Sequence, residues 1–247
     1  MSENSGQATF WDHLDELRMR LIKIVIVVSF LTIIAFLLKE LLFDVILAPK
    51  DSQFVTYRIL NIPNFSIQLI NTGLSEQFMV HMRTALYVGV LAASPYIIYE
   101  LFRFVLPGLY THERRYAYYI GVTSYLMFLI GILLNYFLIF PLTVRFLGTY
   151  QVSSDVTNML SIQSYIDTLI SMSFMMGVLF ELPVVCWLLG RLGIINKSLM
   201  STYRRHAIVV ILVLAAIVTP TTDVFTLFVV SLPIWVLYEL SVLIVKS

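Results

Sequence analysis

Hydrophobic residues along the chain are concentrated in six long segments, which short polar stretches separate. The segments cover residues 21–47, 87–105, 116–142, 162–189, 207–218 and 225–245. Each is apolar around its whole circumference rather than along one stripe, which is typical of helices that face lipid or the interior of a bundle. The pattern therefore predicts an all-α membrane protein, a bundle of six transmembrane helices.

Three of these segments contain an interruption or have an unusual length. The first includes Lys39 and Glu40, where we expect a bend or a frayed turn, and the second can be extended backward through residues 77–86. The fourth is longer than a bilayer core requires, so we expect a tilt of the helix or a bend at Pro183.

The fifth segment is short. Its residues, 207–218, make about 18 Å of helix, whereas the hydrocarbon core of a bilayer is about 30 Å thick. One interpretation is a hairpin with the short sixth helix that does not reach the far surface and thins the bilayer locally. The other is that residues 203–206 extend the helix, with Arg204 and Arg205 reaching the interface. The sequence leaves both open.

Composition supports a membrane protein and narrows its functional classes. Apolar residues make up 59% of the 247 residues and charged residues 13%, against about 25% charged residues in a typical soluble domain. We expect one integral domain over residues 1–247, with a cytoplasmic amphipathic N-terminus (1–20) and a six-span bundle (21–247). The net charge of +1 suggests no nucleic-acid partner. The histidines and the single cysteine, Cys186, lack metal-ligand spacing, so no metal or cofactor is expected.

Lysine and arginine residues are distributed unevenly between the predicted loops. If the N-terminus is inside, the 16 basic residues lie on the cytoplasmic side except for Lys39, Lys50, Arg58, Arg83 and Arg145. Cytoplasmic loops carry such an excess of basic residues. The pattern predicts a multi-pass protein of the inner or plasma membrane with both termini in the cytoplasm.

The stretch before the first segment is amphipathic. Residues 10, 14, 17 and 21 are apolar and fall on one helical face, with acidic and basic side chains on the other. This pattern predicts a helix at the membrane surface. Glu16 and Arg18 would project into the cytoplasm, where they are either available to a charged ligand or simply solvated.

The first cytoplasmic loop, residues 103–115, contains a second carboxylate of interest. Pro107 and Gly108 end the preceding helix. Glu113 follows at the start of the next helix, where a carboxylate is favoured by the helix dipole. Glu113 is therefore either a capping acid or a receptor for a cationic group, because carboxylates bind guanidinium groups strongly.

Glu181 is the one charged residue in the apolar run 172–189. An ionisable side chain at membrane depth costs roughly 2.5–3.5 kcal/mol, which makes it a functional candidate. Pro183 removes a backbone donor close by. Glu181 and Pro183 together predict a polar docking point inside the bilayer, with a hydrogen bond within the bundle as the structural alternative.

Glu100 and Glu239 lie towards predicted cytoplasmic span ends, where we expect interfacial solvation.

Two other functional classes deserve comparison. A secondary transporter with Glu181 as its proton-coupling carboxylate is the alternative, but internal repeats and convergent midplane polar groups are not evident. An intramembrane protease would need a Ser–His pair, paired aspartates or a zinc motif at membrane depth. The sequence has none at the expected positions.

Five motifs in order resemble the TatC family, a subunit of the twin-arginine protein translocase. They are the HLDELRMRL stretch at 13–21, the loop from Phe104 to Arg115, the third-span exit at 135–142, Phe180-Glu181-Leu182-Pro183, and the outer turn around Thr219-Pro220 and Asp223. Any one motif is weak alone. Together they cover nearly the whole chain.

The resemblance implies a receptor rather than an enzyme. TatC proteins bind signal peptides with paired arginines, recruit single-span TatA- or TatB-type partners, and export folded proteins with the proton-motive force. The resemblance also implies several copies per complex. It assigns signal-peptide binding to the cytoplasmic positions, partner-helix docking to Glu181 and Pro183, and loop shaping at the outer face to Pro49 and Asp223. The cytoplasmic positions are Glu16, Arg18, Phe104, Pro107, Leu109 and Glu113.

Overall fold

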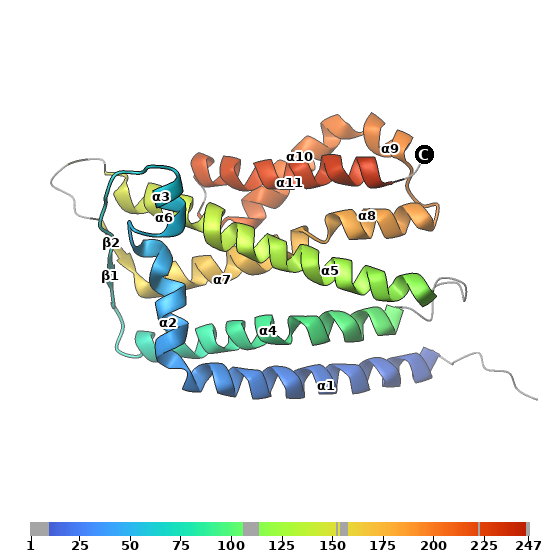
Figure 1. Cartoon of the computed structure of the whole chain (residues 1–247), viewed down its shortest axis with the longest axis horizontal. Coiled ribbons are helices and arrows are strands. Elements are labelled where there is room, and N and C mark those ends of the chain that lie inside the picture. The colour runs from blue at the N-terminus through green and yellow to red at the C-terminus, as the bar shows by residue number, and fades with distance from the viewer. Residues whose placement is uncertain (1–9, 106–113, 152, 154–157, 222, 246–247) are drawn as a thin grey trace, which may run out of the picture. The chain divides into compact units, whose positions relative to one another are not determined.

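The structure is a computed structural model that describes residues 10–105, 114–151, 153, 158–221 and 223–245. Most of these residues are helical, which confirms the predicted helical class (Figure 1). The chain forms two compact units. The first comprises Met1–Leu38 and Ala85–Tyr125, and the second comprises Lys39–Thr84 and Leu126–Ser247.

Five helices in the described part of the chain are long and apolar enough to cross a membrane. They are Leu14–Leu37, Glu76–Leu101, Ile120–Thr149, Ile162–Arg191 and Val224–Ile244. The short fifth segment of the sequence corresponds to α10 (Arg204–Val218), whose 15 residues make about 22 Å of helix. The helix is thus extended through Arg204 and Arg205, as one of the two interpretations expects. The count of six spans stays a prediction.

The first unit contains α1 (Phe10–Leu37) and most of α4 (Glu76–Val105), together with the start of α5 (Arg114–Leu134). α1 is continuous over 28 residues, so the amphipathic stretch runs directly into the first apolar segment instead of forming a separate surface helix. A methyl group on Gly89 of α4 would lie 2.8 Å from the backbone nitrogen of Thr32 in α1. Glycine therefore allows these two helices to approach closely.

The predicted interruption of the first segment is confirmed. α1 ends at Leu37, and α2 (Lys39–Leu47) begins after a turn at Leu38. The last carbonyl groups of a helix lack partners within the helix. In α2 two of them accept hydrogen bonds from tyrosine hydroxyls, Val45 from Tyr136 at 2.6 Å and Ile46 from Tyr165 at 3.0 Å. These bonds fix the end of α2 to the rest of the second unit, to which α2 itself belongs.

A buried tyrosine organises the segment that follows α2. This segment contains η1 (Ala48–Lys50) and α3 (Val55–Ile59). The hydroxyl of Tyr57 lies 2.9 Å from the carbonyl oxygen of Pro49 and 2.8 Å from that of Pro141 in α6 (Phe140–Thr149). Burial raises the pKa of Tyr57, so its hydroxyl stays protonated and able to donate. The neighbouring Thr56 hydroxyl donates to Phe137, whose carbonyl loses its helical partner because Pro141 has no N–H.

Two short parallel strands join the loop before α4 to the loop before α7 (Ile162–Leu179) in the second unit. β1 (Gln68–Ile70) pairs with β2 (Met159–Ser161). The buried carboxylate of Glu76 accepts hydrogen bonds from the backbone of Thr72 at 2.6 Å and Gly73 at 2.8 Å, and from the Ser161 hydroxyl at 2.7 Å. Ser161 also caps α7 (Ile162–Leu179). One carboxylate thus links the starts of α4 and α7.

The hydrophobic core of the second unit lies around α7, α10 and α11 (Val224–Ile244), with the π-helical turn η4 (Asn135–Ile139). Its most buried members include Ile139, Met172, Met176, Ala215, Val230 and Ile234. A smaller apolar cluster forms where α9 (Lys197–Thr202) meets the end of α11. This core holds the break between α7 and α8 (Leu182–Arg191).

Candidate functional site

Arg20 in α1 lies between two carboxylates, one on its own helix and one on α4. Its Nη1 donates a 2.7 Å hydrogen bond to Oε2 of Glu100. Its Nε donates to Oε1 of Glu16 at 3.2 Å, and its Nη2 donates to the same oxygen. Residues 16 and 20 are one helical turn apart, which places their side chains on one face of α1. A guanidinium shared by two carboxylates is the central polar feature of the first unit.

The three side chains differ strongly in exposure. Glu16 is 41% exposed, Arg20 11% and Glu100 6%. A carboxylate as buried as Glu100 needs a paired cation to offset the loss of hydration, and Arg20 supplies it. Glu16 is the member of the cluster that an external ligand can reach.

The structure places the predicted cytoplasmic residues only in part. Glu16 belongs to the ion-pair cluster, whereas Arg18 is exposed and outside it. Phe104 is partly buried near the end of α4. Pro107, Leu109 and Glu113 lie outside the described residues.

Sequence reasoning missed Arg20 and was wrong about Glu100, which is buried and ion-paired instead of solvated. The spacing of Glu16 and Arg20, four residues apart on a helix, was an available signal for their pairing. No sequence pattern near either residue predicts the ion pair between Arg20 and Glu100, because the two residues are 80 positions apart in the chain.

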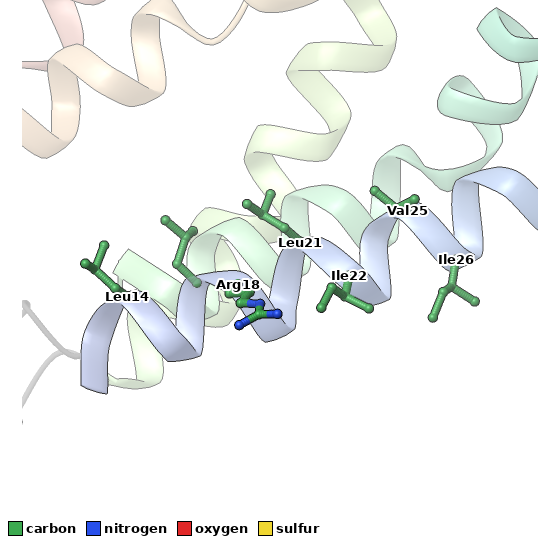
Figure 2. Close-up of a pocket in the computed structure, with 7 residues that line it drawn as sticks. Leu14, Arg18, Leu21, Ile22, Val25 and Ile26 are labelled. Atoms are coloured by element: carbon green, nitrogen blue, oxygen red, sulfur yellow. The ribbon is translucent and has the colours of Figure 1, made fainter. Parts of the chain in front are cut away.

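An apolar groove of about 420 Å³ follows α1 over the same turns as Glu16. Figure 2 shows the side chains that line it. They are Leu14, Leu17, Arg18, Leu21, Ile22, Val25 and Ile26. Arg18 is the one charged residue among these lining side chains. Glu16 lies two residues from both Leu14 and Arg18, so it points away from the face of α1 that these residues line. The first unit therefore presents a reachable carboxylate and an apolar surface on different faces of one helix.

Glu181 lies at a break in the fourth apolar segment. α7 ends at Leu179 and α8 begins at Leu182, so Phe180 and Glu181 form the connecting turn. Pro183, in the first turn of α8, cannot donate a backbone hydrogen bond, which explains the break. The bend expected near Pro183 is confirmed. The backbone of Glu181 is satisfied, because its N–H donates to Val178 and its carbonyl accepts from Val185. Its side chain is partly buried.

Gly131 of α5 and Gly177 of α7 bring these two helices close together just before this break. A methyl group on Gly131 would lie 2.6 Å from the carbonyl oxygen of Met176 and 2.9 Å from the ring of Phe180. One turn further along, the fully buried Asn135 donates a 2.8 Å hydrogen bond to Ser173. Asn135 begins the π-helical turn, a form frequent at functional sites. The residue before Glu181 is thus held by close helix packing.

We predict that Gly131→Ala lowers the stability of the protein by about 1–3 kcal/mol, because the new methyl group meets backbone that cannot move aside easily. Thermal unfolding in detergent measures the effect. Gly121→Ala is the matched control on the same helix, since a methyl group there meets nothing within 4 Å. Equal unfolding midpoints for the two variants would contradict the prediction.

The two residues predicted at the outer face, Pro49 and Asp223, both lie in the second unit. Pro49 is buried in η1, and its carbonyl accepts from Tyr57 as described above. Asp223 is the N-cap of α11, where its carboxylate accepts a 2.7 Å hydrogen bond from the Thr226 backbone. Such a cap satisfies one of the unpaired N–H groups at a helix start. The role of Pro49 and Asp223 in loop shape stays a prediction.

The long apolar helices, with the buried Arg20–Glu100 ion pair between α1 and α4, define a multi-pass helical membrane protein. Within its described residues, no group of three or more His, Cys, Asp or Glu side chains could hold a metal ion. A model of the family Sec-independent protein translocase protein (TatC) matches residues 12–233. The chain belongs to the TatC family, and so to the membrane machinery of twin-arginine protein translocation.

Individual relatives agree with this family over almost the whole chain. The TatC protein of Deinococcus radiodurans is 34% identical, over 96% of this chain and 85% of its own. That of Blattabacterium sp. subsp. Periplaneta americana is 30% identical, over 98% and 96%. A crystal structure of the twin-arginine translocase receptor TatC superposes with a TM-score of 0.76 at 31% identity, covering 94% of this chain and 97% of that one.

Proposed function

We propose that the chain is the signal-peptide receptor and core subunit of a twin-arginine translocase. It binds precursors with paired arginines at the cytoplasmic face and recruits TatA- or TatB-type single-span partners. Folded proteins then cross the membrane with the proton-motive force, and the chain itself catalyses no chemical step. The observation that carries the proposal is Glu16, a reachable carboxylate that already holds one guanidinium group.

The first unit suits a ligand with a cationic end and an apolar stretch. Glu16 offers carboxylate oxygens to an arginine, and the groove on another face of α1 offers apolar surface to the segment that follows. An exposed ion pair contributes only about 0–1 kcal/mol. Burial of apolar area, at about 25 cal/mol per Å², supplies more of the affinity. Arginine contacts therefore select the ligand, while the apolar stretch holds it.

The second arginine of the signal peptide would be held by Glu113 in the first cytoplasmic loop. Phe104, Pro107 and Leu109 would shape this loop and present the carboxylate. Arg18, part of the N-terminal motif, would orient Glu16 rather than touch a cationic ligand. This division follows the family motif, position by position.

The proposed orientation places both termini in the cytoplasm of a cell whose inner or plasma membrane holds the chain. The excess of basic residues in the corresponding loops supports it. α10 and α11 would form a short hairpin from the cytoplasmic side, completing six spans. Several copies of the chain would assemble with the single-span partners.

Glu181 would dock the transmembrane helix of a partner. The break at Phe180–Glu181 places a partly buried carboxyl beside a proline that leaves a backbone carbonyl without its helical donor. Polar groups at membrane depth stabilise helix association through hydrogen bonds across the interface. A polar side chain in the partner helix would bind there.

We expect a photo-crosslinking probe beside Glu113 to label a precursor with paired arginines and to label the same precursor with paired lysines far less. Arginine forms two parallel hydrogen bonds with a carboxylate, and lysine does not. The probe is tested in the full-length protein in membranes. Equal labelling of both precursors, or none with a properly inserted protein, would reject the receptor role and favour a secondary transporter that uses Glu181.

A further inference from the structure

A polar pocket lies in the segment between α2 and α4, within the second unit. Its volume is about 420 Å³, and its lining includes Ser52, Gln53, Arg58, Asn61 and Asn64. Each of these side chains carries hydrogen-bond donors, and none of the described residues that line the pocket is acidic. We propose that this pocket binds the phosphate headgroup of an anionic phospholipid. The inference goes beyond the receptor function and does not depend on it.

Backbone turns fix the walls of this pocket. On one side, the Asp51 carboxylate accepts a 3.0 Å hydrogen bond from the backbone N–H of Gln53. On the other side, α3 ends with Asn61 in the left-handed region, at a φ of 49°. The N–H of Ile62 then donates to the carbonyl of Tyr57 at 2.9 Å, which is the hydrogen bond of a Schellman helix end. Because the Tyr57 hydroxyl is itself held by two backbone carbonyls, the pocket is formed before a ligand binds.

The charges around the pocket favour an anion. Arg58 is exposed and belongs to none of the ion pairs among the described residues. The neighbouring carboxylate of Asp51 does not line the pocket, and one of its oxygens already accepts from Gln53. Burial raises the pKa of Tyr57, whereas the positive charge of Arg145 lowers it, so Arg145 adds positive potential at this wall. A negatively charged group can therefore bind to Arg58 without displacing a carboxylate.

Exposed apolar side chains on α3 indicate a lipid rather than a free anion. Val55 is 51% exposed and Ile59 74%, and their spacing of four residues places them on one face of the helix. In the chain, α3 lies between two segments that are long and apolar enough to cross a membrane, Leu14–Leu37 and Glu76–Leu101. A short segment in this position lies at the membrane surface, where apolar side chains enter the acyl region and basic side chains meet the headgroups.

The lining of the pocket also distinguishes between headgroups. A guanidinium forms two parallel hydrogen bonds with phosphate oxygens. The amides of Asn61 and Asn64 both donate and accept, which suits the hydroxyl groups of phosphatidylglycerol. The ammonium group of phosphatidylethanolamine needs a negatively charged acceptor, which the described lining residues do not supply. We therefore expect the pocket to prefer phosphatidylglycerol.

Native mass spectrometry of the full-length protein in detergent measures the dissociation constant of the first bound lipid. We expect phosphatidylglycerol to bind the wild type about fivefold more tightly than phosphatidylethanolamine with the same acyl chains. Arg58→Gln should weaken binding of phosphatidylglycerol about tenfold and remove this preference. Arg83→Gln is the matched control, because it removes the same charge from an exposed arginine that is paired with Asp167 at 2.8 Å outside the pocket. It should bind phosphatidylglycerol within about twofold of the wild type.

Two further variants separate the parts of the lipid. Asn61→Gly removes the amide but keeps the turn, since glycine adopts a positive φ without strain. We expect it to weaken binding of phosphatidylglycerol about threefold. Ile59→Ser removes an exposed apolar side chain without opening the interior, and we expect a loss of about threefold from the missing acyl contact. Unfolding midpoints close to that of the wild type check that both variants are folded.

Three outcomes would overturn the inference. One is wild-type binding of phosphatidylglycerol by Arg58→Gln, and another is an equal loss in Arg83→Gln, which would show a general effect of charge. The third concerns inorganic phosphate, whose binding is measured by calorimetry and is expected to be far weaker than that of the lipid. Phosphate binding as tight as lipid binding, lost in Arg58→Gln and unchanged in Ile59→Ser, would identify a site for the free ion instead.

Discussion

Glu113→Ala is expected to abolish export of twin-arginine precursors while the protein still inserts into the membrane. Removal of the carboxylate leaves an arginine of the signal peptide at the bilayer surface without its acceptor. The methyl group of alanine cannot accept the two hydrogen bonds that a carboxylate accepts from a guanidinium group. Export is measured as the amount of folded reporter on the outer side of the membrane. The amount of inserted protein is measured in parallel on immunoblots of the membrane fraction.

The control for this variant is a carboxylate outside the proposed site. Glu40→Ala removes an exposed acid from the first turn of α2 and should leave export near the wild-type level. Glu113→Asp keeps the charge with a shorter side chain, and we expect it to retain part of the activity. Normal export by Glu113→Ala at wild-type expression would show that Glu113 is only a helix-capping residue.

The helical fold could be predicted from the sequence because its signals are local. Apolar runs locate the long helices, and single residues locate their interruptions. Lys39 and Glu40 mark the turn after α1, and Pro183 marks the break after α7 because proline has no backbone N–H to donate. A proline alone does not decide a break, since Pro95 and Pro233 lie inside the continuous helices α4 and α11. The extension of α10 through Arg204 and Arg205 could not be decided, since a basic pair at a span end suits a helix and a loop equally.

The polar contacts of the site could not be predicted in the same way. Glu100 looks like an interfacial charge when only its own helix is read, yet it is buried because Arg20 approaches from another helix. The same holds for Glu76, whose partners come from a loop and from the start of α7. Such partners become visible only when segments far apart in the sequence meet. The family motif identified Glu16 without revealing which residue holds it.

Glu181→Ala is expected to weaken recruitment of the single-span partner while signal-peptide binding stays close to the wild-type level. The variant removes the polar group at the break between α7 and α8 but keeps Pro183, so the break itself should persist. An interhelical hydrogen bond in a membrane contributes about 0.6–2 kcal/mol, which corresponds to a roughly three- to thirtyfold loss of affinity. Disulfide crosslinking between a cysteine in α8 and one in the partner helix measures recruitment.

Glu181→Gln separates docking from proton coupling. Glutamine can donate and accept hydrogen bonds but does not titrate, so docking through a hydrogen bond should survive this change. A proton-coupling carboxylate would tolerate neither replacement, because both remove the titratable group. Partner crosslinking that is lost in Glu181→Ala and retained in Glu181→Gln therefore supports docking. Crosslinking unchanged in Glu181→Ala would remove the docking role, and equal loss of transport in both variants would favour a transporter mechanism.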